Sequence, residues 1–365
     1  MFRPEPAPGQ AVLRVDLGAI VANWRDLCAI HGHAVAAVVK ADAYGLGAAA
    51  VGRALQDAGC TIFFVAHLAE GLALRAALGA EPDIVVLNGF PPGADETADL
   101  LPVLNHLGDV AAHTAVGRAS GVPRPALLHL DTGMSRLGLD AREQAALAQD
   151  RTMLDGIALR FVMTHLACAD EPDHPLNTAQ RERFDEAAAR IAPGVPRSFA
   201  NSSGIFLGPS FRSDLARPGC ALYGVNPTPG RINPMRQTVR VEAEILQIRD
   251  IAAGDTVGYG ASWQAQGPRR IATIAAGYAD GYLRSLSGRS LGLLHGRAVP
   301  LVGRVSMDLT TFDVTDVPEA RPGDRLLLIG GEGNTPDDIA ARCGTIGYEI
   351  LTSLGARYAR LYEGG

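Results

Sequence analysis

The sequence has 365 residues, of which 47% are hydrophobic, and a formal net charge of -6 with an isoelectric point near 5.9. A chain of this length exceeds one small core, so we expect a large domain and a smaller one. The acidic balance, without a basic cluster, excludes nucleic acid as an expected partner. Five scattered cysteines without a C-x-x-C pair argue against a disulfide framework or a zinc knuckle. No apolar run is long enough to cross a bilayer and the first residues lack an apolar signal region, so we expect a cytoplasmic protein with no membrane partner.

The first two-thirds of the chain alternates short apolar runs with alanine-rich helical stretches. Expected strands cover residues 35–39, 62–65, 84–87, 110–113, 126–130, 160–164, 198–200 and 222–225. Expected helices cover residues 20–27, 48–58, 70–78 and 94–101. Such alternation predicts parallel βα units, and roughly eight of them favour an N-terminal (β/α)8 TIM-type barrel. A doubly wound sheet is the alternative, although no G-x-G-x-x-G follows the first strand.

The pattern changes after the turn-rich segment that ends at Gly230. We therefore predict a barrel over residues 12–229 and a C-terminal, mostly β domain over residues 230–365, with residues 1–11 as a further candidate strand of that domain. The strands expected there cover residues 239–245, 270–274, 291–294, 310–314 and 326–329, and a short helix covers residues 335–343.

An apolar run over residues 34–39 delivers Lys40 where a strand gives way to a loop with several glycines. In a barrel this is the strand end at which active sites are built. A pocket that partly desolvates a lysine lowers its pKa and makes its amine nucleophilic, so Lys40 is a candidate to hold an aldehyde as a Schiff base. The dipeptide Val39-Lys40 by itself favours a solvated lysine at a strand end.

Other polar residues follow the later strands of the predicted barrel. Arg136 can grip a carboxylate with two parallel hydrogen bonds, and a salt-bridged loop arginine fits it equally well. His165 stands directly after a strand, where a histidine is more often structural than catalytic. The polar loop at residues 170–174 is interpreted as a solvated turn, and we predict no metal site.

Two further groups of residues are candidates for binding. Ser202 follows the expected strand at residues 198–200, and Gly219 and Cys220 directly precede the one at residues 222–225. Barrels commonly bind phosphate with the loops of their last strands and with the backbone N–H groups at helix starts. In the last third, Tyr259 lies between glycines that free its phenol, and it is a candidate acid or base if its pKa falls well below about 10. Tyr278 lies in a similar glycine-flanked loop.

The order of these motifs resembles that of the bacterial alanine racemases. The motifs are Lys40-Ala-Asp-Ala-Tyr44-Gly, Asp131-Thr-Gly-Met-Ser-Arg136-Leu-Gly, Thr164-His165, Ala200-Asn-Ser202, Arg217-Pro-Gly219, Gly258-Tyr259-Gly, Gly277-Tyr278-Ala-Asp-Gly and Ser306-Met307-Asp308. The resemblance covers nearly the whole chain. It implies a barrel that binds pyridoxal 5'-phosphate (PLP), a small amino-acid substrate, and a homodimer in which each β domain completes the partner's site.

The resemblance also implies a role for each site residue. Lys40 is expected to hold PLP and act as one base, and Tyr259 of the partner subunit is expected to be the other. Arg217 faces the pyridine nitrogen in this interpretation, and His165 bridges Arg217 and the tyrosine. The residues implied for phosphate binding are Tyr44, Ser202, Gly219, Cys220 and Tyr348, and those implied for the substrate are Arg136, the Met307 backbone N–H and Tyr278.

One residue departs from the family pattern. Where His129 stands, many members have a lysine carbamylated by carbon dioxide, whose negative charge fixes the nearby arginine. Histidine cannot form that carbamate, so we predict none at this position. Either a neighbouring acid or a bound anion holds Arg136, or Arg136 is less rigid here.

The implied activity is the interconversion of L- and D-alanine for peptidoglycan. Serine or a broader set of amino acids is the alternative substrate, because pocket size discriminates only modestly between small side chains. A PLP decarboxylase is disfavoured by Arg217, since that chemistry calls for a carboxylate at the pyridine nitrogen. A PLP-binding protein without turnover is a further alternative, and it has no use for Tyr259.

Overall fold

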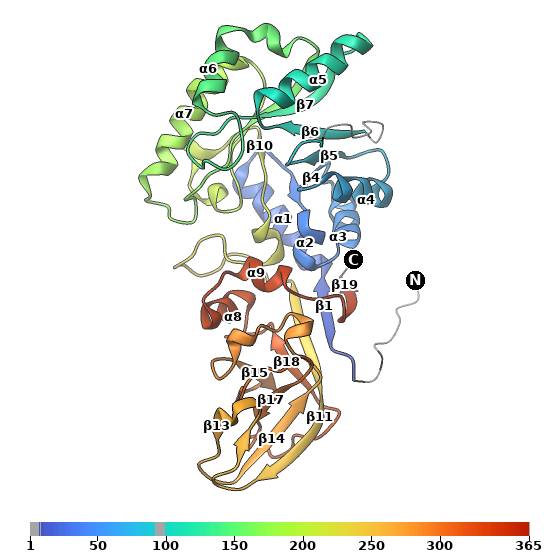
Figure 1. Cartoon of the computed structure of the whole chain (residues 1–365), viewed down its shortest axis with the longest axis vertical. Helices are drawn as coiled ribbons and strands as arrows, with labels where there is room; N and C mark the ends of the chain where they lie inside the picture. Colours follow the sequence, from blue (N-terminus) through green and yellow to red (C-terminus); the bar gives the residue numbers. More distant parts are fainter. Residues whose placement is uncertain (1–6, 8, 92–98, 365) are drawn as a thin grey trace.

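The computed structural model describes residue 7 and residues 9–91 and 99–364. The chain forms two bodies stacked end to end along its long axis (Figure 1). A helix-rich body holds most of the first two-thirds of the sequence, and a body built mainly of strands holds the rest. Within the described residues, no helix is both long and apolar enough to cross a membrane.

The first body is a barrel of parallel strands. Its strands follow one another around the sheet in chain order, as β2–β3 (Ala34–Val35 and Ala37–Val38), β4 (Ile62–Val65), β5 (Asp83–Val86), β6 (Leu100–Leu104), β7 (Arg124–His129), β8 (Ile157–Met163), β9 (Arg197–Ser198) and β10 (Leu215–Ala216). The last strand pairs with β2 while β3 pairs with β4, so the two short pieces act as one strand and close the sheet. This confirms the predicted (β/α)8 barrel.

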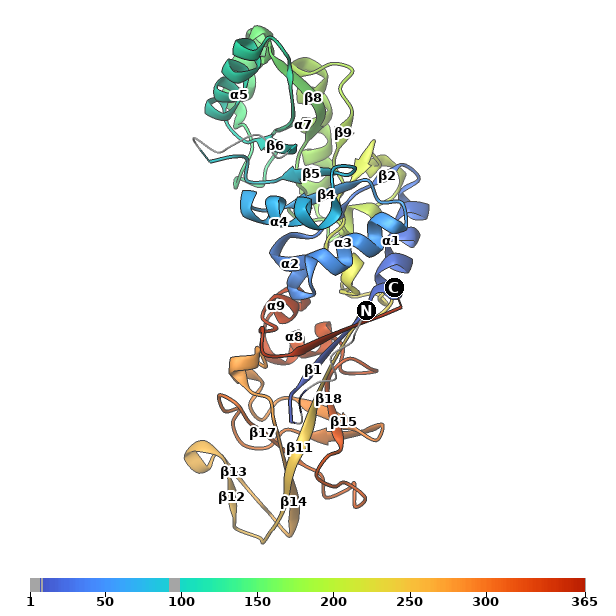
Figure 2. The same ribbon diagram turned by 90° about the vertical axis from the view of Figure 1, so that its right-hand side faces the viewer.

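Apolar side chains fill the barrel interior, including Val38, Phe64, Leu101 and Leu127. The helices on the outside are α1 (Leu17–His31), α3 (Ala48–Asp57), α4 (Leu68–Leu78), α5 (Leu107–Ser120), α6 (Ala141–Gln149) and α7 (Pro175–Ile191). Figure 2, turned by 90°, shows α1, α3 and α4 along one side of the strands. Local sequence sets their ends: Asp16 caps α1 by accepting a hydrogen bond from the Ala19 N–H at 2.8 Å.

Two of the expected strands are wrong. Residues 110–113 lie in helix α5, where Val110, His113, Thr114 and Gly117 are buried at helical spacing. The strand of this unit is instead β6. It includes residues 100 and 101, the last two of the helix expected over 94–101, and residues 94–98 of that expected helix lie outside the described residues.

The other wrong strand covers residues 222–225. Its first two residues lie in a 3-10 turn, η4 (Cys220–Tyr223), which ends at the left-handed Gly224. The last barrel strand is the two-residue β10 just before Arg217, which is too short to leave a periodic signal in the sequence.

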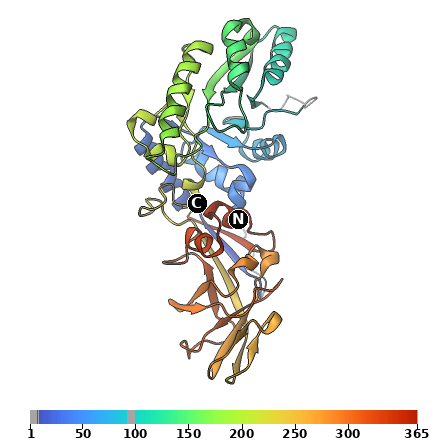
Figure 3. The ribbon, with the colours of Figure 1, turned by 60° about the vertical axis from the view of Figure 1, so that its left-hand side comes forward.

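The second body is mostly β, as predicted. Its main sheet has the order β16 (Arg297–Pro300), β15 (Leu291–Leu294), β18 (Arg325–Ile329), β11 (Val239–Ile251), β1 (Val12–Asp16) and β19 (Ala359–Glu363). Strand β14 (Arg269–Ile274) extends β11 on its far half and pairs with β17 (Thr310–Asp313), and β12 (Thr256–Val257) and β13 (Trp263–Gln264) form a separate hairpin. The helices α8 (Pro336–Cys343) and α9 (Gly347–Thr352) lie between this sheet and the barrel (Figure 3).

The two bodies share the start of the chain. Strand β1 lies in the second body, between β11 and β19, rather than in the barrel. The same segment then caps and begins α1 of the barrel, so the connection is short. The boundaries at residues 12, 229 and 230 stay predictions.

Candidate functional site

Polar side chains gather where the barrel strands end. Each one follows a strand directly or within a few residues: Lys40 after β3, Asn105 after β6, His129 at the end of β7, His165 after β8, Ser202 after β9 and Arg217 after β10. Because parallel strands point the same way, these residues all lie at one end of the barrel, the end at which barrel enzymes carry their chemistry.

Lys40 begins an unusual turn. The next four residues, Ala41 to Tyr44, have φ between 52° and 57°, the left-handed helical region. This conformation costs roughly 1–2 kcal/mol for each residue with a side chain, so the surroundings must hold it. Glu70 accepts a hydrogen bond from the Ala41 N–H at 2.7 Å, and Asp42 accepts one from the Ala48 N–H at 2.7 Å.

The surroundings of Lys40 favour its neutral amine. Its side chain is half-buried, and desolvation lowers the pKa of the ammonium. The positive charge of Arg136 lowers it further, while Glu70 acts in the opposite direction. A lowered pKa increases the share of neutral amine, the form that acts as a nucleophile or a base, at any given pH.

Arg217 is buried at the centre of the site, with 4% of its surface exposed. Its guanidinium donates to the Ser198 hydroxyl at 2.6 Å and to the Thr164 carbonyl at 2.7 Å, and it lies 3.5 Å from His165 Nδ1. Burial lowers the pKa of Arg217 to about 10, so it stays charged at neutral pH. Because a guanidinium only donates, His165 accepts at Nδ1 and carries its proton on Nε2.

Both histidines of the site are neutral. Desolvation, followed by the charge of Arg217, moves the pKa of His165 well below its usual 6.5. The same causes lower the pKa of His129 to about 4, partly offset by Asp131. Burial and the positive charge of Arg217 thus keep both imidazole rings neutral, the form in which one ring nitrogen can accept a hydrogen bond.

A cradle of small groups forms beside Lys40. The Ser202 hydroxyl accepts from the N–H groups of Gly219 at 2.9 Å and Ala221 at 3.3 Å. A Cβ at Gly219 would lie 2.3 Å from the Tyr44 hydroxyl oxygen, so only glycine admits the phenol here. The phenol is buried, which raises its pKa and keeps it a donor. The N–H groups of Gly219 and Ala221 are thus bonded within the cradle, and the hydroxyls of Ser202 and Tyr44 are the donors that it offers to an anion.

The second body adds one phenol to this cradle. Tyr348 is carried by α9, and its hydroxyl accepts a hydrogen bond from the Cys220 thiol at 3.1 Å. Helix α9 packs closely on the turn after Lys40: a Cβ added at Gly45 would lie only 2.6 Å from the Leu351 carbonyl oxygen. The structure thus brings Tyr44, Ser202, Gly219, Cys220 and Tyr348 together, although they span more than three hundred positions.

Three of the predicted residues lie apart from Lys40 in the single chain. Tyr259 is 69% exposed, Met307 is 53% exposed and Tyr278 is 41% exposed. The last two share one surface, because the Tyr278 N–H donates to the Ser306 carbonyl at 3.0 Å. Tyr259 sits between β12 and β13, in a hairpin at the end of the β domain that points away from the barrel (Figures 1 and 2).

Arg136 is also exposed, but it belongs to the Lys40 end of the barrel. It lies in the loop after β7, which Asp131 shapes by accepting hydrogen bonds from the N–H groups of Gly133, Met134 and Ser135 at 2.9–3.2 Å. Across the described chain, no hydrogen bond or ion pair is formed by its guanidinium. It is free to meet a ligand.

Sequence reasoning missed several residues of this site. Ser198 and Thr164 hold Arg217, and the Asn105 amide oxygen accepts a hydrogen bond from His129 Nδ1 at 2.8 Å. Their position directly at strand ends was the available signal. A second signal was also overlooked: Lys40 is the only lysine of the sequence, which marks it even without a motif.

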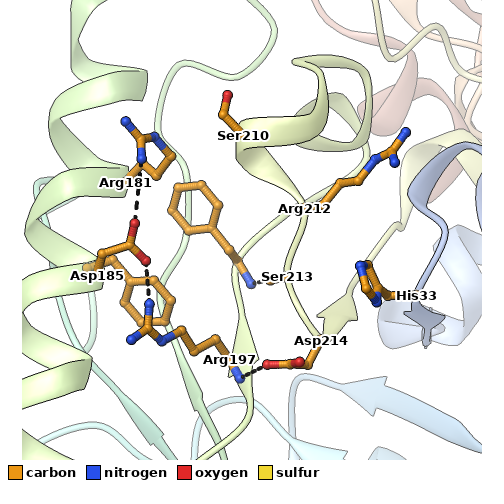
Figure 4. Close-up of a pocket in the computed structure, with 10 residues that line it drawn as sticks. His33, Arg181, Asp185, Arg197, Ser210, Arg212, Ser213 and Asp214 are labelled. Atoms are coloured by element: carbon orange, nitrogen blue, oxygen red, sulfur yellow. Dashed lines mark hydrogen bonds and ion pairs between the residues drawn. The ribbon is translucent and has the colours of Figure 1, made fainter. Parts of the chain in front are cut away.

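A separate pocket of about 260 Å³ opens at the other end of the barrel (Figure 4). His33, Arg197 and Asp214 lie at the amino ends of barrel strands there. Two of its arginines are engaged by Asp185, with Arg197 at 2.6 Å and Arg181 at 3.6 Å. These charges pair with each other, so the pocket is not the candidate site.

Comparisons with known proteins agree on one family. The model of the alanine racemase N-terminal domain matches residues 15–227, and that of the alanine racemase C-terminal domain matches residues 238–362. The alanine racemase of Acidiphilium cryptum is 57% identical over 96% of this chain and 98% of its own, and a catabolic alanine racemase of Mesorhizobium japonicum is 51% identical over 99% and 95%. The structure of alanine racemase from Bartonella henselae with covalently bound pyridoxal phosphate superimposes with a TM-score of 0.93 at 40% identity, covering 97% of this chain and 100% of that one.

Proposed function

The chain belongs to the alanine racemase family, and we propose that it interconverts L-alanine and D-alanine with bound PLP, using Lys40 and Tyr259 of the partner subunit as the two bases. The single observation that carries this proposal is the placement of the only lysine, half-buried, beside a donor-lined cradle and a buried arginine.

The residues present fit PLP. The cradle excludes even one Cβ at Gly219, and its donors include the backbone N–H of Cys220, which begins a 3-10 turn and has no acceptor within it. Tyr44, Tyr348 and Ser202 would hold the phosphate with Gly219 and Cys220, and Lys40 would hold the aldehyde carbon. When bound there, PLP withdraws electrons from the amino acid and acidifies its Cα–H.

Racemisation requires one proton to leave Cα on one face and another to arrive on the opposite face. Two positioned groups do this without a large movement of either. Lys40 serves one face, because its lowered pKa makes the neutral amine available to take up a proton. Tyr259 of the partner subunit serves the other face as phenol or phenolate.

Arg217 and His165 support that second base. The Arg217 charge is fixed by Ser198 and Thr164, and it keeps His165 neutral with its proton on Nε2. That Nε2–H can donate to the oxygen of the partner's Tyr259 and stabilise its ionised form. Because an arginine does not readily give up a proton, Arg217 beside the pyridine nitrogen would leave that nitrogen unprotonated, which would disfavour transamination and decarboxylation.

Substrate recognition falls to residues from both subunits. Arg136, whose guanidinium has no partner in the described chain, is proposed to bind the carboxylate together with the backbone N–H of the partner's Met307. Tyr278 shares the Met307 surface and is proposed to narrow the entrance for a small side chain.

A homodimer follows from this division of roles. Tyr259 is 69% exposed on the β12–β13 hairpin, which lies in the part of the β domain far from the barrel of its own chain, and this supports its action in a second copy. Large exposed aromatic side chains of this kind are common in interfaces. The proposed dimer therefore contains two sites, each with Lys40 from one chain and Tyr259 from the other.

The direct test incubates the purified, PLP-loaded protein with L-alanine and measures D-alanine by chiral chromatography, with L-serine in parallel. We expect D-alanine to form and Tyr259→Phe to abolish it while PLP binding is unchanged. Faster turnover of serine would assign a different substrate to the same chemistry. An unchanged PLP spectrum without any racemisation would instead support a PLP carrier.

We also propose that the D-alanine serves peptidoglycan synthesis. A relative at 51% identity is named catabolic, so the opposite direction is the specific rival. Deleting the gene in its source organism distinguishes the two: a requirement for added D-alanine supports the biosynthetic role, and loss of growth on alanine alone supports the catabolic one.

A further inference from the structure

Arg136 needs a partner that orients its guanidinium, and no lysine of this chain is available to provide one. A lysine-borne carbamate would give Arg136 a negative partner, but the sequence contains a single lysine, and Lys40 is committed to the cofactor. No acidic side chain pairs with Arg136 in the described chain. Two kinds of partner are then open to Arg136: a bound anion, or a neutral acceptor among the side chains at this end of the barrel.

His129 is fixed as such an acceptor by Asn105. The Asn105 amide nitrogen donates to the carbonyls of Leu87 at 2.9 Å and Val103 at 3.1 Å. Turning the amide over would face its oxygen against both carbonyls, so the oxygen must point to His129 Nδ1, at 2.8 Å. That oxygen can only accept. His129 therefore carries its proton on Nδ1, and Nε2 has a free lone pair.

The loop that carries Arg136 is folded onto the His129 ring. A Cβ at Gly138 would lie 3.0 Å from both Cγ and Cδ2 of the ring, so only glycine, with φ of 101°, permits this packing. Backbone bonds close the loop at its base, from the Leu139 N–H to the His129 carbonyl at 2.8 Å and from the Asp131 N–H to the Leu139 carbonyl at 3.0 Å. Arg136 is thus tethered two residues from the ring.

We propose that His129 is a positioning residue: its unprotonated Nε2 accepts a hydrogen bond from the Arg136 guanidinium and so directs Arg136 toward the substrate carboxylate. This rests on the proposed function of Arg136 in binding that carboxylate. The two side chains are not hydrogen-bonded in the structure, so exposed Arg136 changes rotamer to make the contact. Protonation of His129 would destroy the acceptor, and the nearby charges of Arg217 and Arg136 oppose it.

Two variants of nearly equal size separate positioning from structure. In His129→Gln the side-chain amide reaches the place of Nε2, whereas in His129→Asn it reaches the place of Nδ1 and keeps only the bond to Asn105. If His129 positions Arg136, His129→Asn should raise the KM for alanine by about tenfold, because a charged hydrogen bond is lost. It should raise the Kd of propionate, a competing carboxylate measured by calorimetry with the PLP-loaded dimer, by the same factor. Gln is expected to rescue both values.

A purely structural role predicts the reverse order, with Asn tolerated and Gln impaired, and that result would overturn the proposal. Equal behaviour of the two variants would overturn it as well. Arg136→Ala separates this failure from failure of the proposed function: if it leaves the Kd of propionate unchanged, Arg136 does not bind the carboxylate at all. Nitrogen NMR of 15N-histidine-labelled protein gives a readout independent of turnover, and an Nε2–H tautomer of His129 would contradict the geometry.

Discussion

The bond between Ser198 and Arg217 allows a stringent test of the site's organisation. Ser198→Ala removes the acceptor that the buried guanidinium meets at 2.6 Å, and it also removes a bond from the same hydroxyl to the Leu215 carbonyl at 2.9 Å. A buried charged donor left without an acceptor costs about 1.5–3 kcal/mol, and the neutral bond adds about 1 kcal/mol. We therefore expect the free energy of unfolding to fall by about 3 kcal/mol.

Ser213→Ala is the matched control. Its hydroxyl donates to the same Leu215 carbonyl at 3.2 Å and accepts from the Phe199 N–H at 3.1 Å, but it does not touch the guanidinium. The expected loss is about 1 kcal/mol. Urea denaturation of the cofactor-free protein, followed by circular dichroism, compares both without a contribution from PLP binding. Equal losses in the two variants would refute the idea that Ser198 acts through Arg217.

Three further outcomes follow from the geometry. Gly219→Ala places a Cβ 2.3 Å from the Tyr44 hydroxyl oxygen and should weaken PLP binding about tenfold in a spectral titration, whereas Gly267→Ala, with nothing within 4 Å, should not. Tyr259→Phe should lower kcat by at least about a hundredfold while the Kd of PLP stays constant, because it removes only the acid/base group. The pKa of His129 falls to about 4 on folding, so its contribution to stability is complete above pH 6.5 and lost as the pH drops through about 4. As the pH falls between those values, the free energy of unfolding should therefore decrease less for His129→Gln than for the wild type, by about 3 kcal/mol at most. Parallel plots of this free energy against pH would show that His129 does not titrate there.

The sequence predicted the barrel because its strands and helices alternate, and Ile62–Val65 was placed correctly from its apolar run alone. It failed where a strand is too short to show a period. The two-residue β10 was missed, and buried residues at helical spacing in α5 were interpreted as a strand. A short, mainly apolar segment such as Val-Ala-Ala-His at residues 110–113 cannot by itself distinguish the two structures.

The site was predicted in a similar, partial way. Lys40 was found because chemistry follows barrel strands, and Arg217 was found only through the family resemblance. The left-handed turn after Lys40 was not predicted, since Ala-Asp-Ala-Tyr has no intrinsic preference for it. A tertiary hydrogen bond from the Ala41 N–H to Glu70 helps to hold that turn. The role of Asn105 could not be read from the sequence either, because it depends on two carbonyls that only the folded chain brings together.

The measurement closest to the central claim is complementation between two inactive variants. Lys40→Ala and Tyr259→Phe are co-expressed with different tags, and the mixed dimer is purified and assayed for D-alanine formation. One of its two sites has both Lys40 and the partner's Tyr259 intact, so the purified mixed dimer should recover about half of the wild-type activity, and an unpurified random mixture of subunits about a quarter. No recovery in a purified mixed dimer would contradict a site shared between two chains, and appreciable activity of Tyr259→Phe alone would contradict the second base.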